Sequence, residues 1–321
     1  MSPMRILLIH TGGTIGMVRS DDGFRPEVGV VEEEAARLCR EVFQSTSITV
    51  QRLEPLIDSA NATPQDWNRI TETISAKYAD FDGFLVTHGT DTLTYTAAAL
   101  TMALQGLAKP VVMTGSMLPL TEPDNDGHRN LHDAITAVQT ARPGVWVQFA
   151  GRLLHGGRIR KTHSDTFDAF AAVPSEAPPL HRGDMFQRHA FAPCEVAILP
   201  VAPGASSAVL SYAAAQCDGI VLRCFGSGTV PNTPDLMAAL QNCARRNVPV
   251  IAVSQCAEGR IALGTYAAGA ILKQNDVGDG RDMTMEAAYV KMVLALGRGG
   301  DVDEMRRFLT TPLAGELTAV G

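Results

Sequence analysis

The sequence lacks the features of several classes of protein. Its 321 residues contain no stretch long and apolar enough to span a membrane, and the apolar run at 5–10 is too short for the core of a signal peptide. The six cysteines are scattered without paired spacing or a CxxC motif, so we expect reduced thiols, no metal site and a cytoplasmic protein. Positive charge is not in excess either. The net charge of −7 makes nucleic acid and anionic membranes poor partners.

Short β-branched segments alternate with helical patterns in the first half of the chain. The strand candidates are 5–10, 48–53, 82–88, 109–115 and 144–149. A helix is predicted from Thr63 to Tyr78, with Thr63 as its cap, Pro64 at its first position and Asp66 in its first turn. A second helix is predicted to begin near Thr92. This alternation predicts a mostly parallel sheet with helices on both faces.

The alternation pauses at 173–193, which holds four prolines and little periodicity. It resumes with strand candidates at 195–201, 218–225 and 248–254 and helical patterns at 233–246, 286–296 and 301–310. With 45% hydrophobic residues, a chain of this length can bury two cores. We therefore predict an α/β protein with a larger N-terminal catalytic domain over 1–173, a linker over 174–194 and a smaller C-terminal α/β domain over 195–321.

Polar clusters follow three of the predicted strands, at the point where each strand ends. They are Thr11–Thr14, His88–Thr92 and Thr114–Ser116. The carboxyl ends of parallel strands share one edge of a sheet, and ligands bind in the crevice beside that edge. We therefore expect these hydroxyls and the Asp91 carboxylate to lie close together.

The first cluster, TGGT, is compatible with a nucleotide-binding loop or with a loop that presents a hydroxyl. A dinucleotide-binding loop would have glycine in place of Thr11 and would open a helix, whereas Val18–Gly29 reads as an irregular loop. A GK[ST] motif is absent as well, so nucleotide binding is disfavoured. The glycines instead allow close approach of the backbone to a ligand while Thr14 presents its hydroxyl. A plain tight turn is the alternative.

The second cluster, HGTDT, has a structural and a catalytic interpretation. Asp91 or Thr92 is expected to cap the helix that follows. A cap does not explain the whole string, and a threonine hydroxyl such as that of Thr90 becomes a nucleophile once a base removes its proton. Lys161 is the candidate base, because neighbouring cations and burial both disfavour a charged lysine. A solvated basic loop over 156–170 is the alternative.

Four long segments carry a recognisable pattern: TGGTIGM (11–17), DGFLVTHGTDTLTYTAAAL (82–100), KPVVMTGSMLPL (109–120) and the segment around Lys161. Together they resemble the cytoplasmic type I form of the bacterial-type asparaginase/glutaminase family. The resemblance extends through VSQCAEGRI, DMTMEAA and GELT near the C-terminus. It implies the asparaginase/glutaminase fold, no cofactor or metal, and hydrolysis of L-asparagine to L-aspartate and ammonia through an acyl-threonine. The resemblance leaves open whether glutamine is hydrolysed as a minor second substrate.

The resemblance also implies roles for individual residues. Thr14 corresponds to the nucleophile, and Thr90, Asp91 and Lys161 correspond to a second catalytic set. The implied substrate-binding residues are Asp58, Ser59, Ala60, Gly89, Thr90, Asp91 and Tyr266. Because Tyr266 would reach the site of a neighbouring subunit, the resemblance implies a homodimer or homotetramer.

Two positions depart from the family pattern. Phe24 stands where relatives have a tyrosine, so it can cover the site but offers no hydroxyl, and Thr229 stands where many relatives have asparagine. We expect Val18–Gly29 to close over the substrate as a lid, with Phe24 as part of the cover.

Two other functions are compatible with the same fold. One is the ammonia-generating component of a tRNA-dependent amidotransferase, which usually carries an extra N-terminal domain, whereas here the first catalytic strand begins at residue 5. The other is a catalytically silent asparagine-binding protein, which is disfavoured by the four intact residues Thr14, Thr90, Asp91 and Lys161.

Overall fold

The computed structural model describes residues 3–173, 185–206 and 208–319. Backbone contacts divide them into two compact units. Unit 1 holds the described residues of Met1–Ala172 and Pro179–Arg188, and unit 2 holds those of Val173–Pro178 and His189–Gly321. Much of the predicted linker lies outside the described residues, so the predicted domain boundaries stay a prediction.

Unit 1 is built on a six-stranded sheet in the order β4–β1–β5–β7–β8–β9. The strands are β1 (Met4–His10), β4 (Thr46–Arg52), β5 (Gly83–Thr87), β7 (Pro110–Thr114), β8 (Gly144–Phe149) and β9 (Arg152–His155). Neighbouring strands are parallel except β8 and β9, which are antiparallel at one edge. The central strands β5 and β7 are buried along their whole length, as expected for strands covered on both faces. The prediction of a mostly parallel sheet is confirmed.

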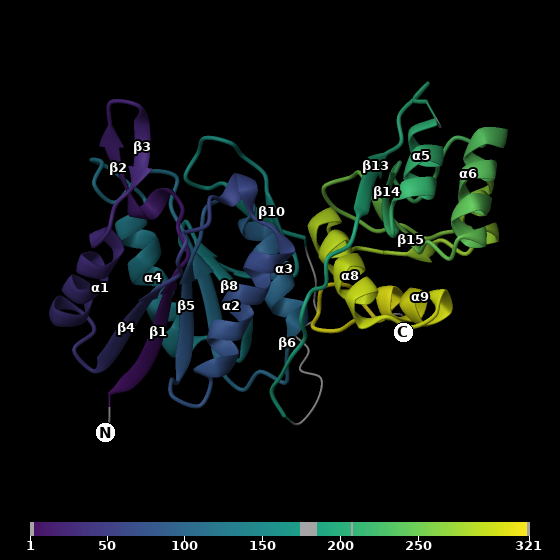
Figure 1. Cartoon of the computed structure of the whole chain (residues 1–321). Helices are drawn as coiled ribbons and strands as arrows, with labels where there is room; N and C mark the ends of the chain where they lie inside the picture. The colour runs from purple at the N-terminus through teal and green to yellow at the C-terminus, as the bar shows by residue number, and fades with distance from the viewer. Residues whose placement is uncertain (1–2, 174–184, 207, 320–321) are drawn as a thin grey trace. The chain divides into compact units, whose positions relative to one another are not determined.

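Helices cover both faces of this sheet (Figure 1). They are α1 (Val30–Glu41), α2 (Pro64–Ala76), α3 (Leu93–Ala103) and α4 (Gly127–Thr140). Successive residues of a strand point to opposite faces. Leu7 and Phe84 therefore pack in one core cluster with α2 and α3, whereas Ile6 and Leu85 pack in another with α1 and α4.

The first turns of the helices differ in the signals that they carry. α2 begins at Pro64 as predicted, and the amide and the hydroxyl of Thr63 both donate to the Asp66 carboxylate at 2.9 Å. α1 and α4 lack such a cap, because Gly29 and Asp126, which precede them, make no side-chain cap bond to the helix. No helix is predicted from the sequence in either segment.

Two segments of unit 1 that the sequence suggested as loops form antiparallel hairpins. β2 (Met17–Ser20) pairs with β3 (Gly23–Pro26), so the expectation of an irregular loop over Val18–Gly29 is wrong. This hairpin projects beyond the end of the sheet at which β1 ends (Figure 1). β10 (Ile159–Lys161) pairs with β11 (Phe170–Ala172), which places Lys161 on a strand rather than in a solvated loop.

Part of the predicted linker belongs to unit 1. The short strand β12 (Gln187–Arg188) pairs antiparallel with β6 (Leu104–Gln105). The Phe186 ring stacks on the Tyr78 ring with centroids 3.8 Å apart. The strand pairing and the ring stack together hold this segment against the residues that follow α2 and α3.

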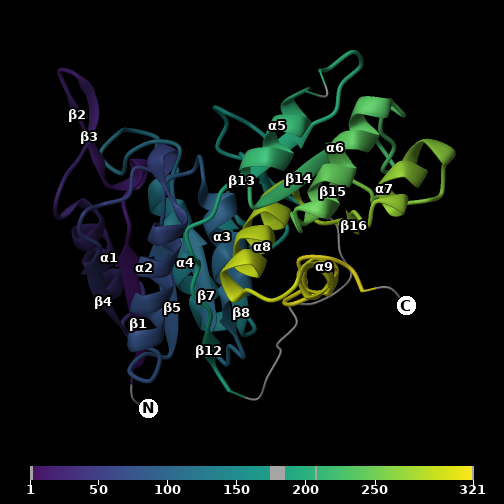
Figure 2. The same cartoon turned by 45° about the vertical axis from the view of Figure 1, so that its right-hand side comes forward.

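Unit 2 contains a smaller parallel sheet in the order β13–β14–β15–β16. Its elements are β13 (Val196–Pro200), α5 (Ala208–Gln216), β14 (Gly219–Cys224), α6 (Pro234–Arg245), β15 (Val250–Ser254), α7 (Ala270–Gln274), β16 (Gly278–Asp279), α8 (Met285–Arg298) and α9 (Val302–Thr310). Helices α5 and α6 cover one face of this sheet, and α8 and α9 lie on the other (Figure 2). The predicted smaller α/β unit is confirmed. None of the helices in the described ranges combines the length and the hydropathy needed to cross a membrane.

Candidate active site

The three polar clusters of unit 1 meet at one edge of the sheet. β1, β5 and β7, the strands that carry them, are neighbours and run parallel. The Thr11 hydroxyl donates to the Thr87 carbonyl at 2.8 Å, and the His88 amide donates to the Thr114 carbonyl at 2.9 Å. The first bond ties the first cluster to the last residue of β5, directly before the second cluster, and the second bond ties the second cluster to the third.

Glycines allow the three clusters to pack backbone against backbone. Gly13 has a φ of 90°, and a Cβ at this position would lie 2.5 Å from the amide nitrogen of Gly89. A Cβ on Gly115 would lie 2.3 Å from the carbonyl oxygen of His88. A side chain at either glycine would therefore push the loops apart. Glycine at position 13 thus allows the first loop of the site to lie directly against the loop that contains Gly89.

The turn around Asp58 joins the same edge. The Ile57 amide donates to the Thr11 carbonyl at 2.6 Å. The Asp58 carboxylate accepts bonds from the Ala60 amide at 3.2 Å and from the Asn61 side-chain nitrogen at 2.7 Å. Both carboxylate oxygens thereby hold the turn in shape while the side chain stays exposed.

The turn continues as the short helix η2 (Ser59–Asn61), which packs against the second cluster. Ser59 is buried. A Cβ on Gly89 would lie 2.5 Å from the Ser59 hydroxyl oxygen, so only glycine fits there. The predicted substrate-binding residues Asp58, Ser59, Ala60 and Gly89 therefore form one contiguous group.

Lys161 reaches the second cluster from β10. Its Nζ donates to the Thr90 hydroxyl at 3.0 Å and to the Asp91 carboxylate at 2.8 Å. The hairpin register, in which Lys161 is paired with Phe170, determines where this side chain emerges. Thr90 is buried, whereas the side chain of Lys161 is 20% exposed and that of Asp91 is 64% exposed. The three side chains form a hydrogen-bonded chain from a buried hydroxyl to solvent.

Thr14 lies at the start of the short helix η1 (Thr14–Gly16), directly after Gly13. Because the Gly13 backbone lies against Gly89, Thr14 belongs to the same edge as Thr90. The structure therefore brings together eight of the nine residues predicted for the site, which all belong to unit 1: Thr14, Asp58, Ser59, Ala60, Gly89, Thr90, Asp91 and Lys161.

The first residue of the second cluster, His88, is a buried histidine to which the sequence analysis assigned no role. His88 Nδ1 lies 2.8 Å from the Gly89 carbonyl oxygen, and Nε2 lies 3.0 Å from the Thr96 hydroxyl oxygen. Burial lowers the pKa of His88, so the ring is neutral, with Nδ1–H donating to the carbonyl and Nε2 accepting from the hydroxyl. Burial also lowers the pKa of His10, whose Nδ1 lies 2.8 Å from the Thr87 hydroxyl oxygen.

Comparison with known proteins assigns the chain to a family. The family model "Asparaginase, N-terminal" matches residues 5–186, and the model of the glutaminase/asparaginase C-terminal domain matches residues 195–309. The chain belongs to the asparaginase family. It is 36% identical over 337 residues to L-asparaginase 1 of Escherichia coli K12, covering 99% of both chains. The resemblance inferred from the sequence motifs is thereby confirmed.

Two further members of the asparaginase family are informative. The solved L-asparaginase I of Vibrio cholerae superposes with a TM-score of 0.89 at 31% identity, covering 99% of this chain and 100% of that one. A component of the glutamyl-tRNA(Gln) amidotransferase of Thermococcus kodakarensis is 32% identical over 338 residues, which cover 98% of this chain and 76% of the relative. The asparaginase/glutaminase fold predicted from the sequence is confirmed.

Tyr266, the ninth residue predicted from the asparaginase family, lies in unit 2. It precedes the short helix η3 (Ala267–Gly269), and it is 57% exposed. Its exposure leaves the phenol accessible to another chain, and its role stays a prediction.

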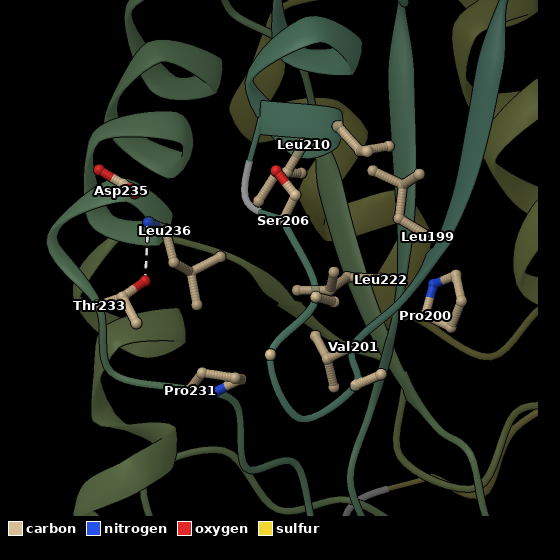
Figure 3. A pocket seen from close by; sticks show the side chains of 14 residues that line it. Leu199, Pro200, Val201, Ser206, Leu210, Leu222, Pro231, Thr233, Asp235 and Leu236 are labelled. Atoms are coloured by element: carbon tan, nitrogen blue, oxygen red, sulfur yellow. Dashed lines mark hydrogen bonds between the residues drawn. The ribbon is translucent and has the colours of Figure 1, made fainter.

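Unit 2 also contains a pocket of about 560 Å³ beside β13, α5 and α6 (Figure 3). Its walls are mainly apolar and include Leu199, Val201 and Leu222. The Thr233 hydroxyl accepts a bond from the Leu236 amide at 3.2 Å and so caps α6. None of the residues predicted for the asparaginase site lines this pocket.

Two histidines four positions apart on α4 have a spacing that zinc sites use. His128 Nδ1 lies 2.8 Å from the Glu34 carboxylate, and His132 Nδ1 lies 3.1 Å from the Asp133 carboxylate. The Nδ1 atom of each ring therefore already has a carboxylate partner, and the two partners are different. No group of three or more metal-binding side chains is found within residues 3–173, 185–206 and 208–319.

Proposed function

We propose that this protein is an L-asparaginase that hydrolyses L-asparagine to L-aspartate and ammonia. The observation that carries the proposal is the hydrogen-bonded chain of Thr90, Lys161 and Asp91, which lies at the edge that holds Thr14. Membership of the asparaginase family supports the same reaction. The proposed enzyme uses no cofactor or metal.

The proposed reaction is a double displacement through an acyl-threonine. The Thr14 hydroxyl oxygen attacks the side-chain amide carbon of asparagine, and the hydroxyl proton passes to the leaving nitrogen. Ammonia departs and leaves an aspartyl ester on Thr14. Water then attacks the ester carbon, and a proton from that water returns to the Thr14 oxygen as aspartate is released.

We assign the proton transfers to the chain that Lys161 makes with Thr90 and Asp91. A lysine accepts a proton only while its amine is neutral, and Asp91 can hold the resulting ammonium in place. Main-chain N–H groups around Thr14 and Thr90 are assigned to the developing oxyanion. Such donors typically stabilise a transition state by about 3–4 kcal/mol each.

The substrate's α-amino and α-carboxylate groups are assigned to the turn beside the second cluster. A carboxylate binds an ammonium group strongly, which suits Asp58 and Asp91. The Ser59 hydroxyl suits the α-carboxylate, and Ala60 and Gly89 contribute main-chain groups. Tyr266 is assigned to the site of a neighbouring subunit in a cytoplasmic homodimer or homotetramer.

Ammonia release by the purified protein tests this function. We expect release from L-asparagine, with less from L-glutamine. Thr14→Ala and Thr90→Val should each lose turnover on the order of 10⁴-fold or more while they retain the fold by circular dichroism. Mass spectrometry of a slow variant, quenched during turnover, should find an aspartyl group on the peptide that contains Thr14. Near-normal turnover by Thr14→Ala would overturn the mechanism.

The same assay separates the two other functions. Release from glutamine but not from asparagine would favour the amidotransferase component. Binding of asparagine without release of ammonia from either amide would favour a silent binding protein.

A further inference from the structure

Thr92 makes a bond that its position in the fold does not predict. It is the N-cap residue of α3, with φ −121° and ψ 14°, yet its side chain makes no cap bond to the helix. The expectation that Asp91 or Thr92 caps this helix through its side chain is therefore wrong for Thr92. Its hydroxyl instead donates to the main-chain carbonyl of Ser59 at 2.7 Å, 33 positions earlier in the chain.

An N-cap threonine ordinarily accepts a bond from the second or third amide of its helix. Thr92 does not do so, and its hydroxyl hydrogen goes to a different segment of the chain. The bond therefore acts on the turn that carries Asp58 and Ser59.

That turn is held at both ends by other loops of the site. At its start, the Ile57 amide donates to the Thr11 carbonyl at 2.6 Å. At its other end, the Ser59 carbonyl accepts from Thr92 while the Ser59 hydroxyl lies against Gly89, where a Cβ would come within 2.5 Å. The contact with Gly89 limits how close the turn can come, and the bond from Thr92 prevents it from moving away.

We propose that Thr92 is a positioning residue that holds Asp58 and Ser59 at a fixed distance from Thr90 and Lys161. The inference rests on the proposed function, in which the first pair binds the α-groups of asparagine and the second pair serves the reaction. In this role the Thr92 hydroxyl acts through the main chain of Ser59 and not as a catalytic group. Its loss therefore weakens substrate binding more than it slows the chemical steps.

Thr92→Val, which replaces the hydroxyl by a methyl group, tests this role. We expect the KM for L-asparagine to rise by about three- to tenfold, which corresponds to the net value of one hydrogen bond between uncharged groups, while kcat changes by less than about twofold. Thr92→Ser keeps the hydroxyl and should restore the KM. Thr92→Ala gives the same readout if the valine variant does not fold.

The matched control is Thr101→Val on the same helix. The Thr101 side chain is buried whereas that of Thr92 is half-buried, and the Thr101 hydroxyl likewise donates to a main-chain carbonyl, that of Ala97, at 2.7 Å. This bond lies within α3, so its loss should lower the melting temperature without changing the KM. A structural role for Thr92 would make both valine variants behave alike.

Inhibition by the product and by a product analogue provides a second readout. L-Aspartate carries both α-groups, whereas succinate lacks the α-amino group that Asp58 is proposed to bind. Thr92→Val should therefore weaken inhibition by L-aspartate more than inhibition by succinate. An unchanged KM in Thr92→Val, or no recovery in Thr92→Ser, would overturn the role of Thr92 while the wild-type activity still supports the proposed function. Absence of ammonia release by the wild-type protein would overturn both.

Discussion

The two units each contain a lysine paired with a carboxylate, and the two pairs differ in their surroundings. Lys161 lies 2.8 Å from Asp91, with side-chain exposures of 20% and 64%. Lys291 lies 2.5 Å from Glu316, and both side chains are 0% exposed. The pair in unit 1 also bonds the hydroxyl of Thr90. The pair in unit 2 is bonded instead to the main chain, because Lys291 donates to the Thr311 carbonyl at 2.6 Å.

The main-chain partners explain how unit 2 tolerates a fully buried ion pair. The Glu316 carboxylate accepts amide bonds from Leu313 at 3.0 Å and from Ala314 at 2.8 Å. Burial alone would raise the pKa of Glu316, but the charge of Lys291 and these hydrogen bonds outweigh it and lower the pKa. Both oxygens of the Glu316 carboxylate therefore accept hydrogen bonds from groups that the fold holds in place. The same two chemical groups are therefore structural in unit 2, whereas in unit 1 they lie beside a hydroxyl and solvent.

The largest effect predicted by this contrast is on turnover, at Lys161. Lys161→Met should lower kcat for asparagine by on the order of 10²–10⁴-fold with little change in the melting temperature, because the lost group transfers protons and is partly solvated. Lys161→Arg should not restore activity, since a guanidinium stays protonated at working pH. Steady-state kinetics and thermal melts of the same preparations measure both quantities. Full activity in Lys161→Arg would contradict the proton-transfer role.

The next largest effect is on stability, at Lys291. Lys291→Met leaves the Glu316 carboxylate buried without its charge partner, which typically costs about 3–5 kcal/mol of unfolding free energy. Urea unfolding of the variant should show this loss. The matched variant Glu316→Gln leaves the lysine charge unpaired and should be destabilised to a similar degree. A loss below about 1 kcal/mol in both variants would show that water or another group replaces the missing partner.

The sequence predicts the sheets well because their strands carry strong local signals. β5 and β7 are short β-branched runs that are buried on both faces, and such runs end where polar residues begin. The rule that loops at the carboxyl edge of a parallel sheet carry the ligand site then brought Thr14 and Thr90 together without any knowledge of side-chain contacts. Local pattern and topology were enough for this part of the site.

Other parts of the site depend on pairings that no local pattern contains. Lys161 reaches Thr90 because β10 pairs with β11 in one particular register, and a shift of one residue would turn its side chain to the other face. The bond from Thr92 to Ser59 spans 33 positions in the same way. Propensity also favoured a conventional cap at Thr92, and tertiary packing overrode it.

A smaller predicted effect is the dependence of folding stability on pH, which arises from two buried histidines at the site in unit 1. The pKa of His88 and that of His10 are lowered by burial. Just below pH ~6.5, these two histidines therefore bind fewer protons in the folded protein than in the unfolded chain. Stability present above pH ~6.5 should therefore be lost as the pH falls through that value, by up to about 1.4 kcal/mol per pH unit for each histidine.

Urea midpoints between pH 8 and pH 5.5 measure this loss. His88→Asn, whose amide nitrogen can replace Nδ1 as the donor to Gly89, should reduce the slope with pH. An unchanged slope would show that His88 is protonated equally in both states. The carboxylates with lowered pKa values, such as Asp66 and Glu316, contribute mainly below pH ~5.

The smallest effect tests the β2–β3 hairpin, whose closure over the site stays a prediction. Arg19 lies directly opposite Phe24 in the hairpin, stacks on its ring at 5.2 Å, and pairs with Glu122 at 2.6 Å. This ion pair joins the hairpin to the loop that follows β7, so it should limit opening. Glu122→Gln weakens the pair and should speed chymotrypsin cleavage after Phe24 by a few fold. The effect is small because exposed ion pairs are weak and screened by salt.

Glu27→Gln is the matched control for the hairpin, since Glu27 pairs with Arg25 at 3.0 Å within the same segment and not with the loop after β7. This variant should be cleaved at the wild-type rate. Saturating L-aspartate should slow cleavage of the wild-type protein if the hairpin closes over the bound ligand, because a closed lid removes the extended segment that a protease needs. Equal rates with and without aspartate would argue against a lid. Equal rates in the wild type and Glu122→Gln would show that packing rather than the ion pair holds the hairpin.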